Sequence, residues 1–276
     1  AEGLVDFLDK GYTFRYVDDE MTPEKAIRDD TVFVELSHVD YRTGRMFDMA
    51  SITAYARDKG AHMIWDLAHS AGSVLVDLKG SNADFAVGCT YKYLNCGPGS
   101  PGFAWVNSKH FNRVWQPLSG WWGHARPFSM ESTYDPCNGI KSLLCGTQPI
   151  VSLSLLECGL DIALRADMQL IREKSLALSD LFIYLVKKRC ADFPLTLITP
   201  EEHNKRGSHV SFRHPNGYEV MQALISRGLI GDYREPEVLR FGMTPLYMSF
   251  VDIWDAVEIL RDVLETKSWD LSLIHI

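Results

Sequence analysis

Two polar segments, each following an apolar run, carry the residues best suited to chemistry. Lys92 lies just before a glycine-rich bend, and Asp66 and His69 lie together in the other segment. A lone lysine at a strand end is usually a surface residue whose stem packs while its amine stays in water. An amine and a carboxylate at two such ends are typical of a Schiff-base cofactor site, because a protonated pyridine nitrogen needs a carboxylate partner.

The first half of the chain alternates short apolar segments with a helical pattern, and this alternation must position those residues. We expect strands at 31–37, 61–65, 84–89 and 103–106, and a helix at 48–59 that begins at an aspartate and ends before Gly60. The pattern predicts βαβ units and an α/β fold with a mostly parallel sheet. Ligands bind at the carboxyl ends of such strands, where Ser37, Asp66 and Lys92 all fall.

The second half of the chain has a different pattern. After an irregular stretch rich in Trp, Gly and Pro, Thr147 is expected to cap a long helix whose first turn holds Pro149. Further helices are expected near 167–190, 217–227 and 249–266, with strands near 195–199, 208–213 and 237–243. We therefore expect a large domain at 1–150, a connecting helix and smaller α+β domain at 151–270, and an unexplained tail at 271–276.

The composition favours an enzyme of the cytoplasm. Of 276 residues, 46% are apolar and 23% charged, so the chain can bury a core. The net charge of −8 argues against a nucleic-acid partner or an anionic membrane surface. Six cysteines include no C-x-x-C pair, so we expect reduced thiols and no metal site. The chain opens on Ala1 in mid-pattern, and we expect it to be a fragment.

Three further residues have a structural and a functional interpretation each. A lone histidine such as His69 is more often structural, but its place beside Asp66 favours contact with a cofactor over a metal. Trp121 lies in a polar loop between two glycines. Its ring can either pack within the loop or donate its indole N–H to a ligand. Thr147, at the start of a helix, can either cap it or bind a phosphate there.

One arginine in an expected strand is a candidate for binding a carboxylate. Arg240 would usually face solvent, but in a cleft its fork suits an amino-acid carboxylate. Arg234 and Arg213 are rivals on composition alone. The charged residues of 203–209 are interpreted as a solvated turn.

The bend after Lys92 matches a dinucleotide-binding fingerprint only literally. In Gly97-x-Gly99-x-x-Gly102, two prolines occupy variable positions and a strand is expected to follow in place of a helix. We interpret these glycines as the means by which the backbone turns tightly below the lysine.

Several longer stretches together resemble kynureninase, a family of pyridoxal-phosphate (PLP) enzymes of fold type I, class V aminotransferase-like. The stretches are S-H-V-D-Y-R-T-G (37–44), D-L-A-H-S-A-G (66–72), Y-K-Y-L-N-C-G-P-G (91–99), S-G-W-W-G-H (119–124), C-G-T-Q-P (145–149), K-R-G-S-H-V-S-F (205–212), G-D-Y-R-E-P (231–236) and R-F-G-M-T-P-L-Y (240–247). The likeness runs from about residue 30 to 270 and implies a large PLP-binding domain with a smaller C-terminal one.

The resemblance implies a role for each candidate residue. Lys92 would form the Schiff base with PLP and move protons, Asp66 would pair with the pyridine nitrogen, and His69 would lie beside the cofactor. Phosphate ligands would be Tyr91, Trp121 and Thr147, the last two from the partner subunit of a homodimer. Ser37 would contact the cofactor and Arg240 would hold the substrate carboxylate. Tyr91 would also donate a proton.

The reaction implied is hydrolytic cleavage of the Cβ–Cγ bond of kynurenine, or 3-hydroxykynurenine, to an anthranilate and alanine. The family has a further N-terminal stretch that supplies a ring stacked on PLP, a second aspartate and phosphate contacts. We therefore expect this polypeptide alone to be poorly active. The alternatives are another class V activity, such as a cysteine desulfurase using Cys137 or Cys145 or an aminotransferase, and an inactive remnant.

Overall fold

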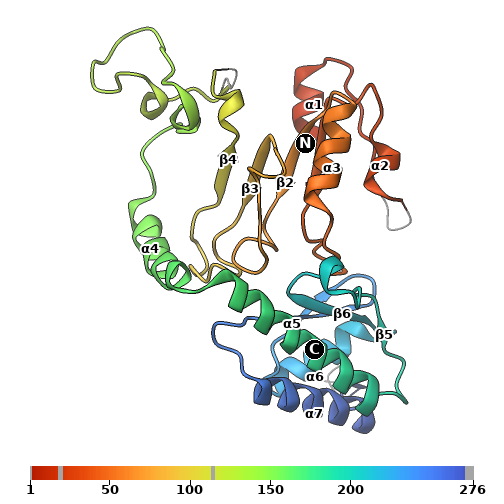
Figure 1. The fold of residues 1–276 in the computed structure, drawn as a ribbon. Coiled ribbons are helices and arrows are strands. Elements are labelled where there is room, and N and C mark those ends of the chain that lie inside the picture. The colour runs from red at the N-terminus through yellow and green to blue at the C-terminus, as the bar shows by residue number, and fades with distance from the viewer. Residues whose placement is uncertain (1, 18–20, 113–115, 271–276) are drawn as a thin grey trace.

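The chain forms two sheets, each covered by helices, in a computed structural model that describes residues 2–17, 21–112 and 116–270 (Figure 1). The first sheet has the order β1-β2-β3-β4, with bounds Phe33–Ser37, His62–Asp66, Phe85–Gly88 and Phe103–Val106. β1, β2 and β3 are parallel, and β4 runs antiparallel to β3. The mostly parallel sheet expected from the sequence is confirmed.

Helix α3 (Met49–Asp58) covers one face of this sheet and buries its core. Asp48 caps the helix by accepting from the Ser51 amide, and Gly60 follows it at φ +81°, as the sequence predicts. Met63 and Trp65 lie on the same face of β2 and are fully buried. The Trp65 indole N–H donates to the Thr53 hydroxyl in α3 at 3.0 Å. Two short helices, α1 (Glu2–Leu8) and α2 (Pro23–Ala26), precede β1.

The second sheet is antiparallel and lies below the first in Figure 1. Its order is β5-β6-β8-β7, with bounds Thr196–Leu197, His209–Arg213, Val238–Gly242 and Asp232–Arg234. Helices α5 (Met168–Arg189), α6 (Gly217–Ser226) and α7 (Phe250–Thr266) share one apolar core with β6 and β8. Among the helices in the described part of the chain, none has the length and apolarity to cross a membrane.

The two-residue period of β6 and β8 decides which side chains face the first sheet. Phe212 and Leu239 belong to the core under the helices. Because side chains alternate across a strand, Ser211 and Arg240, which lie opposite each other in the ladder, point to the other face. That face meets the loop after β1, where Thr199 donates to the Thr43 carbonyl at 2.6 Å. The sequence period thus places one arginine between the two sheets.

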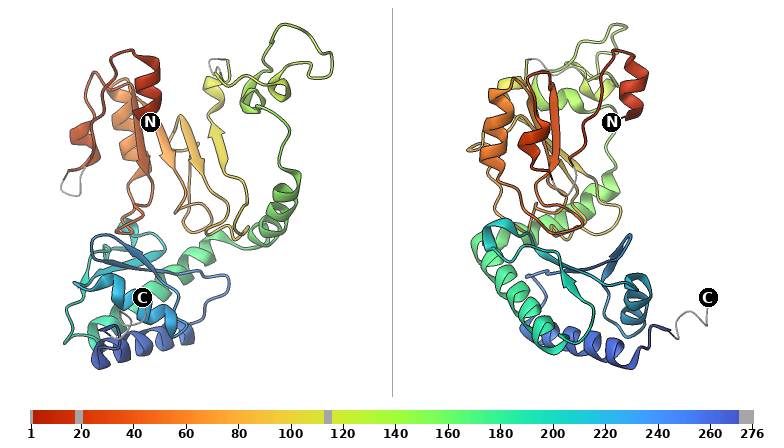
Figure 2. Two further views of the ribbon diagram at one scale, coloured as in Figure 1. Left: turned by 180° about the vertical axis from the view of Figure 1, so that it is seen from behind. Right: turned by 90° about the vertical axis from the view of Figure 1, so that its right-hand side faces the viewer.

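The connection between the sheets extends away from both of them (Figure 2). It contains the short 3-10 helices η1 (Ser108–His110), η2 (Trp121–Gly123) and η3 (Gly139–Leu143), and then α4 (Ile150–Arg165). The expectation that Thr147 caps α4 is wrong, because Pro149 is the N-cap residue. Only Gly159 of α4 is buried, and Val151 and Leu164 are 76% and 82% exposed.

The interpretation of residues 203–209 as a solvated turn is wrong in part. His203 and Lys205, in 3-10 helix η4 (His203–Lys205), are exposed, but Arg206 is buried with an ion pair to Asp180. His209 begins β6 and is buried against the first domain. Backbone contacts explain this burial, since the Met46 amide donates to the Lys205 carbonyl. The expected tail at 271–276 lies outside the described residues.

Candidate functional site

The carboxyl ends of the first three strands open into a pocket of about 410 Å³ between the two sheets. Ser37 and Asp66 are the last residues of β1 and β2 and pair in the ladder, and Lys92 follows β3 by a short turn. The pocket is lined by Ser37, Tyr41, Asp66, Ala68, His69, Tyr91, Lys92, Arg234 and Arg240. Six of the eight predicted site residues line this pocket, and Trp121 and Thr147 do not.

Lys92 has an amine that is partly buried and only weakly engaged. Its Nζ lies 3.5 Å from His69 Nδ1 and 5.6 Å from the centre of the Tyr91 ring. Burial lowers the pKa of Lys92, and Arg240 and Arg234 lower it further, against the opposing effects of Cys89 and Asp66. A lysine whose pKa is lowered is more often neutral near pH 7 and is then a nucleophile.

Asp66 presents a carboxylate that is fixed but still has room for a ligand. Its Oδ1 accepts from the Ala68 amide at 2.8 Å, and its Oδ2 accepts from the Ser37 hydroxyl at 3.3 Å. A carboxylate offers about four acceptor positions, so two contacts leave it able to accept another N–H from the pocket.

Two histidines lie side by side behind the lysine. The rings of His69 and His209 have centroids 5.6 Å apart. Burial lowers the pKa of His69 to about 3, with further lowering by Lys92, and burial likewise lowers the pKa of His209 to about 3. Both rings are therefore neutral at pH 7, and His69 can accept a hydrogen bond from Lys92. The interpretation of residues 203–209 as a solvated turn missed the place of His209 beside His69.

Arg240 reaches the pocket from the second sheet. It forms an ion pair with Asp232 and donates to the Tyr41 carbonyl at 2.7 Å. A guanidinium has five N–H donors, so three remain after these two contacts. Arg234 also lines the pocket and pairs with Asp232 at 2.8 Å, whereas the other rival, Arg213, is exposed. The two-residue period of β8 was the signal in the sequence for Arg240. No comparable signal pointed to Tyr41, and only composition pointed to Arg234.

Trp121 and Thr147 lie on the connection that extends from the body of the molecule. Trp121 packs edge-on against Trp122 and Phe128 and is 44% exposed, and Thr147 is exposed. Neither residue lines the pocket of its own chain, so each could contact the phosphate only in the pocket of another subunit. Their role as phosphate ligands stays a prediction.

The glycine bend after Lys92 has the geometry of a turn. Gly97 and Gly99 have φ of +80° and +83°, a region that favours glycine. Strand β4 follows the bend, so the interpretation of these glycines as a tight turn is confirmed. A nucleotide-binding helix would have to start where β4 lies.

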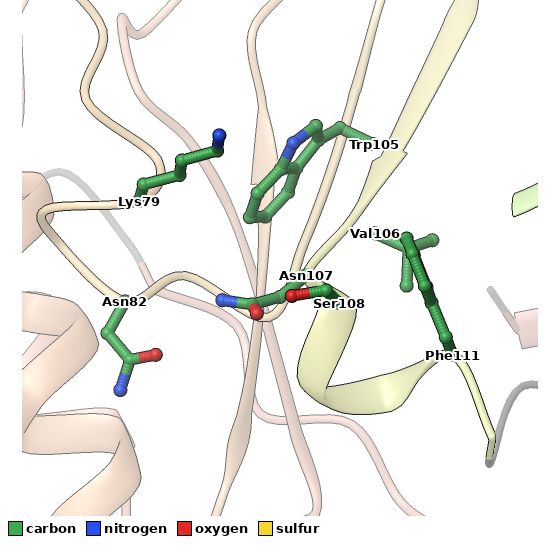
Figure 3. Close-up of a pocket in the computed structure, with 7 residues that line it drawn as sticks. All are labelled: Lys79, Asn82, Trp105, Val106, Asn107, Ser108 and Phe111. Carbon is green, nitrogen blue, oxygen red and sulfur yellow. The ribbon is translucent and has the colours of Figure 1, made fainter. Parts of the chain in front are cut away.

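A second hollow, of about 420 Å³, lies beside the other end of β4 (Figure 3). It is lined by Lys79, Asn82, Trp105, Val106, Asn107, Ser108 and Phe111. These residues include one amine and two amides but no carboxylate or histidine. The pocket at Lys92 is therefore the better candidate for acid–base chemistry.

Comparison with known proteins agrees with this geometry. Residues 171–260 match the family model described as the kynureninase C-terminal domain. A kynureninase from Burkholderia mallei is 60% identical over 269 residues, which are 98% of this chain and 65% of the relative. The chain is thus similar to kynureninases along nearly its whole length. It spans about 65% of the length of the curated kynureninases that it matches.

Solved structures of other proteins have the same fold. A cysteine desulfurase from Thermococcus onnurineus superposes with a TM-score of 0.79 at 20% identity, covering 96% of this chain and 69% of that one. The cystine C–S lyase C-DES superposes with a TM-score of 0.73 at 19% identity, covering 87% and 63%. The expected fold-type I architecture is confirmed.

Proposed function

We propose that this chain carries the site for PLP-dependent hydrolysis of the Cβ–Cγ bond of L-kynurenine, giving anthranilate and L-alanine, with 3-hydroxykynurenine as a related substrate. The observation that carries the proposal is the convergence of Lys92, Asp66 and Arg240 in one pocket. These residues are an amine, a carboxylate and a guanidinium from three separate segments. The kynureninase relationship selects the reaction among those that such a set can support.

The residues of the pocket fit PLP chemically. Lys92 would bind the aldehyde carbon, Asp66 would accept from the protonated ring nitrogen, and Ser37 and His69 would contact the ring. Tyr91 would bind the phosphate from within the pocket. When bound, PLP supplies an electron sink for charge that develops on the substrate α-carbon.

The side chains of this chain would then divide the reaction among them. Arg240 uses its remaining N–H groups to hold the substrate carboxylate, while Asp232 keeps the guanidinium in place. Lys92 takes the α-proton through Nζ, which its lowered pKa favours. Tyr91 is placed beside Lys92 to donate a proton to the alanine fragment after water has added to the side-chain ketone.

We further propose that the protein acts as a cytoplasmic homodimer. Trp121 and Thr147 lie outside their own pocket, and the apolar residues of α4 are exposed, which supports a second subunit against this connection. All six cysteines are free, which fits a reducing compartment. The expectation that this polypeptide alone is poorly active rests on the family likeness and stays a prediction.

The test is to incubate the PLP-loaded chain with kynurenine and, separately, with cysteine. Anthranilate fluorescence with stoichiometric alanine supports the proposal. Sulfide from cysteine without anthranilate from kynurenine would instead assign a desulfurase, for which Cys137 and Cys145 are the candidates. Kynurenine that is bound but never cleaved, even by a large excess of chain over long incubation, would contradict the proposed reaction for this polypeptide.

A further inference from the structure

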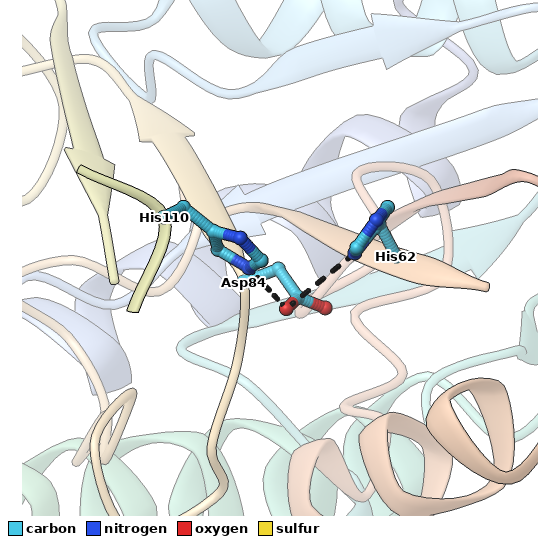
Figure 4. Close-up of side chains that lie close together, drawn as sticks. All are labelled: His62, Asp84 and His110. Atoms are coloured by element: carbon cyan, nitrogen blue, oxygen red, sulfur yellow. Dashed lines mark hydrogen bonds and ion pairs between the residues drawn. The ribbon is translucent and has the colours of Figure 1, made fainter. Parts of the chain in front are cut away.

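The amino ends of the same strands carry a second cluster of polar side chains, at the edge of the sheet opposite the pocket. His62 is the first residue of β2, Asp84 precedes β3, and His110 ends η1 after β4. Figure 4 shows the Asp84 carboxylate between the two imidazole rings. Spacing along the chain does not reveal this cluster, because its three members are 22 to 48 residues apart and meet only in the folded sheet.

The distances within the cluster are close to those of a metal site. Asp84 Oδ1 lies 2.6 Å from His110 Nε2 and 3.7 Å from His62 Nδ1, and the three atoms all lie within 4.8 Å of one another. Ligands on a tetrahedral zinc ion, with bonds of about 2.0–2.1 Å, are separated by roughly 3.3 Å. To bind zinc, the distance between Asp84 and His110 must lengthen slightly, and the distance between Asp84 and His62 must shorten.

We propose that His62, Asp84 and His110 form a binding site for a divalent transition-metal ion, with Zn²⁺ as the best match. Two imidazoles and one carboxylate suit zinc, whereas magnesium and calcium prefer oxygen ligands alone. The His62 side chain is 44% exposed, so water can complete the coordination from that side. The proposal does not depend on the proposed PLP chemistry, which occupies the other edge of the sheet.

The surroundings already hold the ligands in place. Asp84 Oδ2 accepts from the Met63 amide at 2.9 Å, which fixes the carboxylate and leaves Oδ1 directed at the histidines. The His110 ring stacks on Phe85, with centroids 5.0 Å apart and planes 17° apart. His62 packs edge-on against His110 at 5.2 Å. Such support restricts ring orientation before an ion binds.

Lys109 competes with a metal ion for the Asp84 carboxylate. Its Nζ lies 2.8 Å from Asp84 Oδ1 and supplies the positive charge that the carboxylate now pairs with. The same amine also contacts the Asn82 carbonyl at 3.2 Å and Asn82 Oδ1 at 3.1 Å. The Lys109 amine can therefore leave Asp84 and still keep both hydrogen bonds to Asn82. A metal ion that binds Asp84 would then take the place of the positive charge of Lys109.

The experiment is to titrate the chain, with any purification tag removed, with Zn²⁺ by calorimetry and with Co²⁺ by visible absorption. We expect one ion per chain and a cobalt spectrum with nitrogen and oxygen ligands. His62→Ala should weaken Zn²⁺ binding by more than the roughly 10–100-fold that loss of an outer-shell partner costs. His203→Ala removes an exposed histidine in η4 and should leave binding unchanged. Lys109→Met should tighten binding roughly fivefold, because the competing charge is gone.

Each outcome decides for or against the site. Binding that His62→Ala abolishes and His203→Ala spares supports it, and tighter binding by Lys109→Met supports the proposed exchange of charge. No Zn²⁺ binding by the native chain, equal loss in both histidine variants, or equal affinity for Mg²⁺ would overturn it. Because His62 is half-exposed, circular dichroism of His62→Ala is expected to match the native spectrum, and Lys109→Met gives an independent test if it does not.

Discussion

The two edges of the first sheet carry the same kinds of side chain but pair them differently. At the amino edge, Asp84 makes close contacts with Lys109, His110 and the Met63 amide. Burial raises the pKa of Asp84, but those hydrogen bonds outweigh it and lower the pKa to about 2. At the carboxyl edge, the Lys92 amine contacts His69 Nδ1 only at 3.5 Å and lies 5.6 Å from the centre of the Tyr91 ring.

The two edges of the sheet have different roles, one in stability and the other in chemistry. A closely paired buried carboxylate stabilises the fold, because removal of one partner leaves a charge without compensation. An amine that is partly desolvated and weakly paired keeps its reactivity for a ligand. Mutations at the carboxyl edge should therefore alter binding and turnover, and mutations at the amino edge should alter stability.

The largest effect is expected from Asp66→Asn at the carboxyl edge. Loss of the charge facing the pyridine nitrogen should lower kcat/KM for kynurenine by roughly 10²–10³-fold. The absorption spectrum of bound PLP should change in parallel, while the urea midpoint of unfolding stays within experimental error. Unchanged turnover would remove Asp66 from the proposed site.

Asp84→Asn at the amino edge should have the opposite signature. We expect the free energy of unfolding to fall by about 2–3 kcal/mol, because the buried Asp84 side chain loses its charged contacts with Lys109 and His110. Urea titration measures this change. A variant as stable as the native chain, but with altered PLP binding, would reverse the comparison between the edges.

Arg240→Ala should raise KM for kynurenine by roughly 10–100-fold, since it removes charged hydrogen bonds to the substrate carboxylate. Arg213→Ala, at an exposed position on β6, is the matched control and should leave KM unchanged. Steady-state kinetics that show equal effects in the two variants would contradict the assignment of Arg240.

The smallest effect concerns pH and the buried His209. Its pKa is lowered to about 3 by burial, whereas a histidine in the unfolded chain has a pKa of about 6.5. The unfolded state therefore binds more protons between these values, and stability falls as pH falls below about 6.5. Between pH 7.5 and 5.5 this one group should cost about 1.4 kcal/mol. His209→Gln should flatten that part of the pH profile, and His203→Gln should not.

The sequence predicted the parts of this molecule that local periodicity and chain order determine. Asp66 and Ser37 were placed correctly because both end apolar strands of one parallel sheet, and Asp48 was recognisable as a helix cap. The predicted cap of α4 was wrong because the helix begins at Ile150 with Pro149 as its N-cap, two residues after Thr147. His209 and the Asp84 cluster depend on contacts between distant segments, which no spacing along one strand reveals.

Chemical trapping of PLP shows whether Lys92, and not Lys109 at the other edge, forms the Schiff base. The chain is incubated with PLP, reduced with borohydride and digested, and the modified lysine is located by mass spectrometry, with Lys92→Ala and Lys109→Ala as matched variants. A pyridoxyl group on Lys92 that is lost in Lys92→Ala and kept in Lys109→Ala is the predicted result. Labelling of Lys109, or equal labelling of the native chain and Lys92→Ala, would contradict the account.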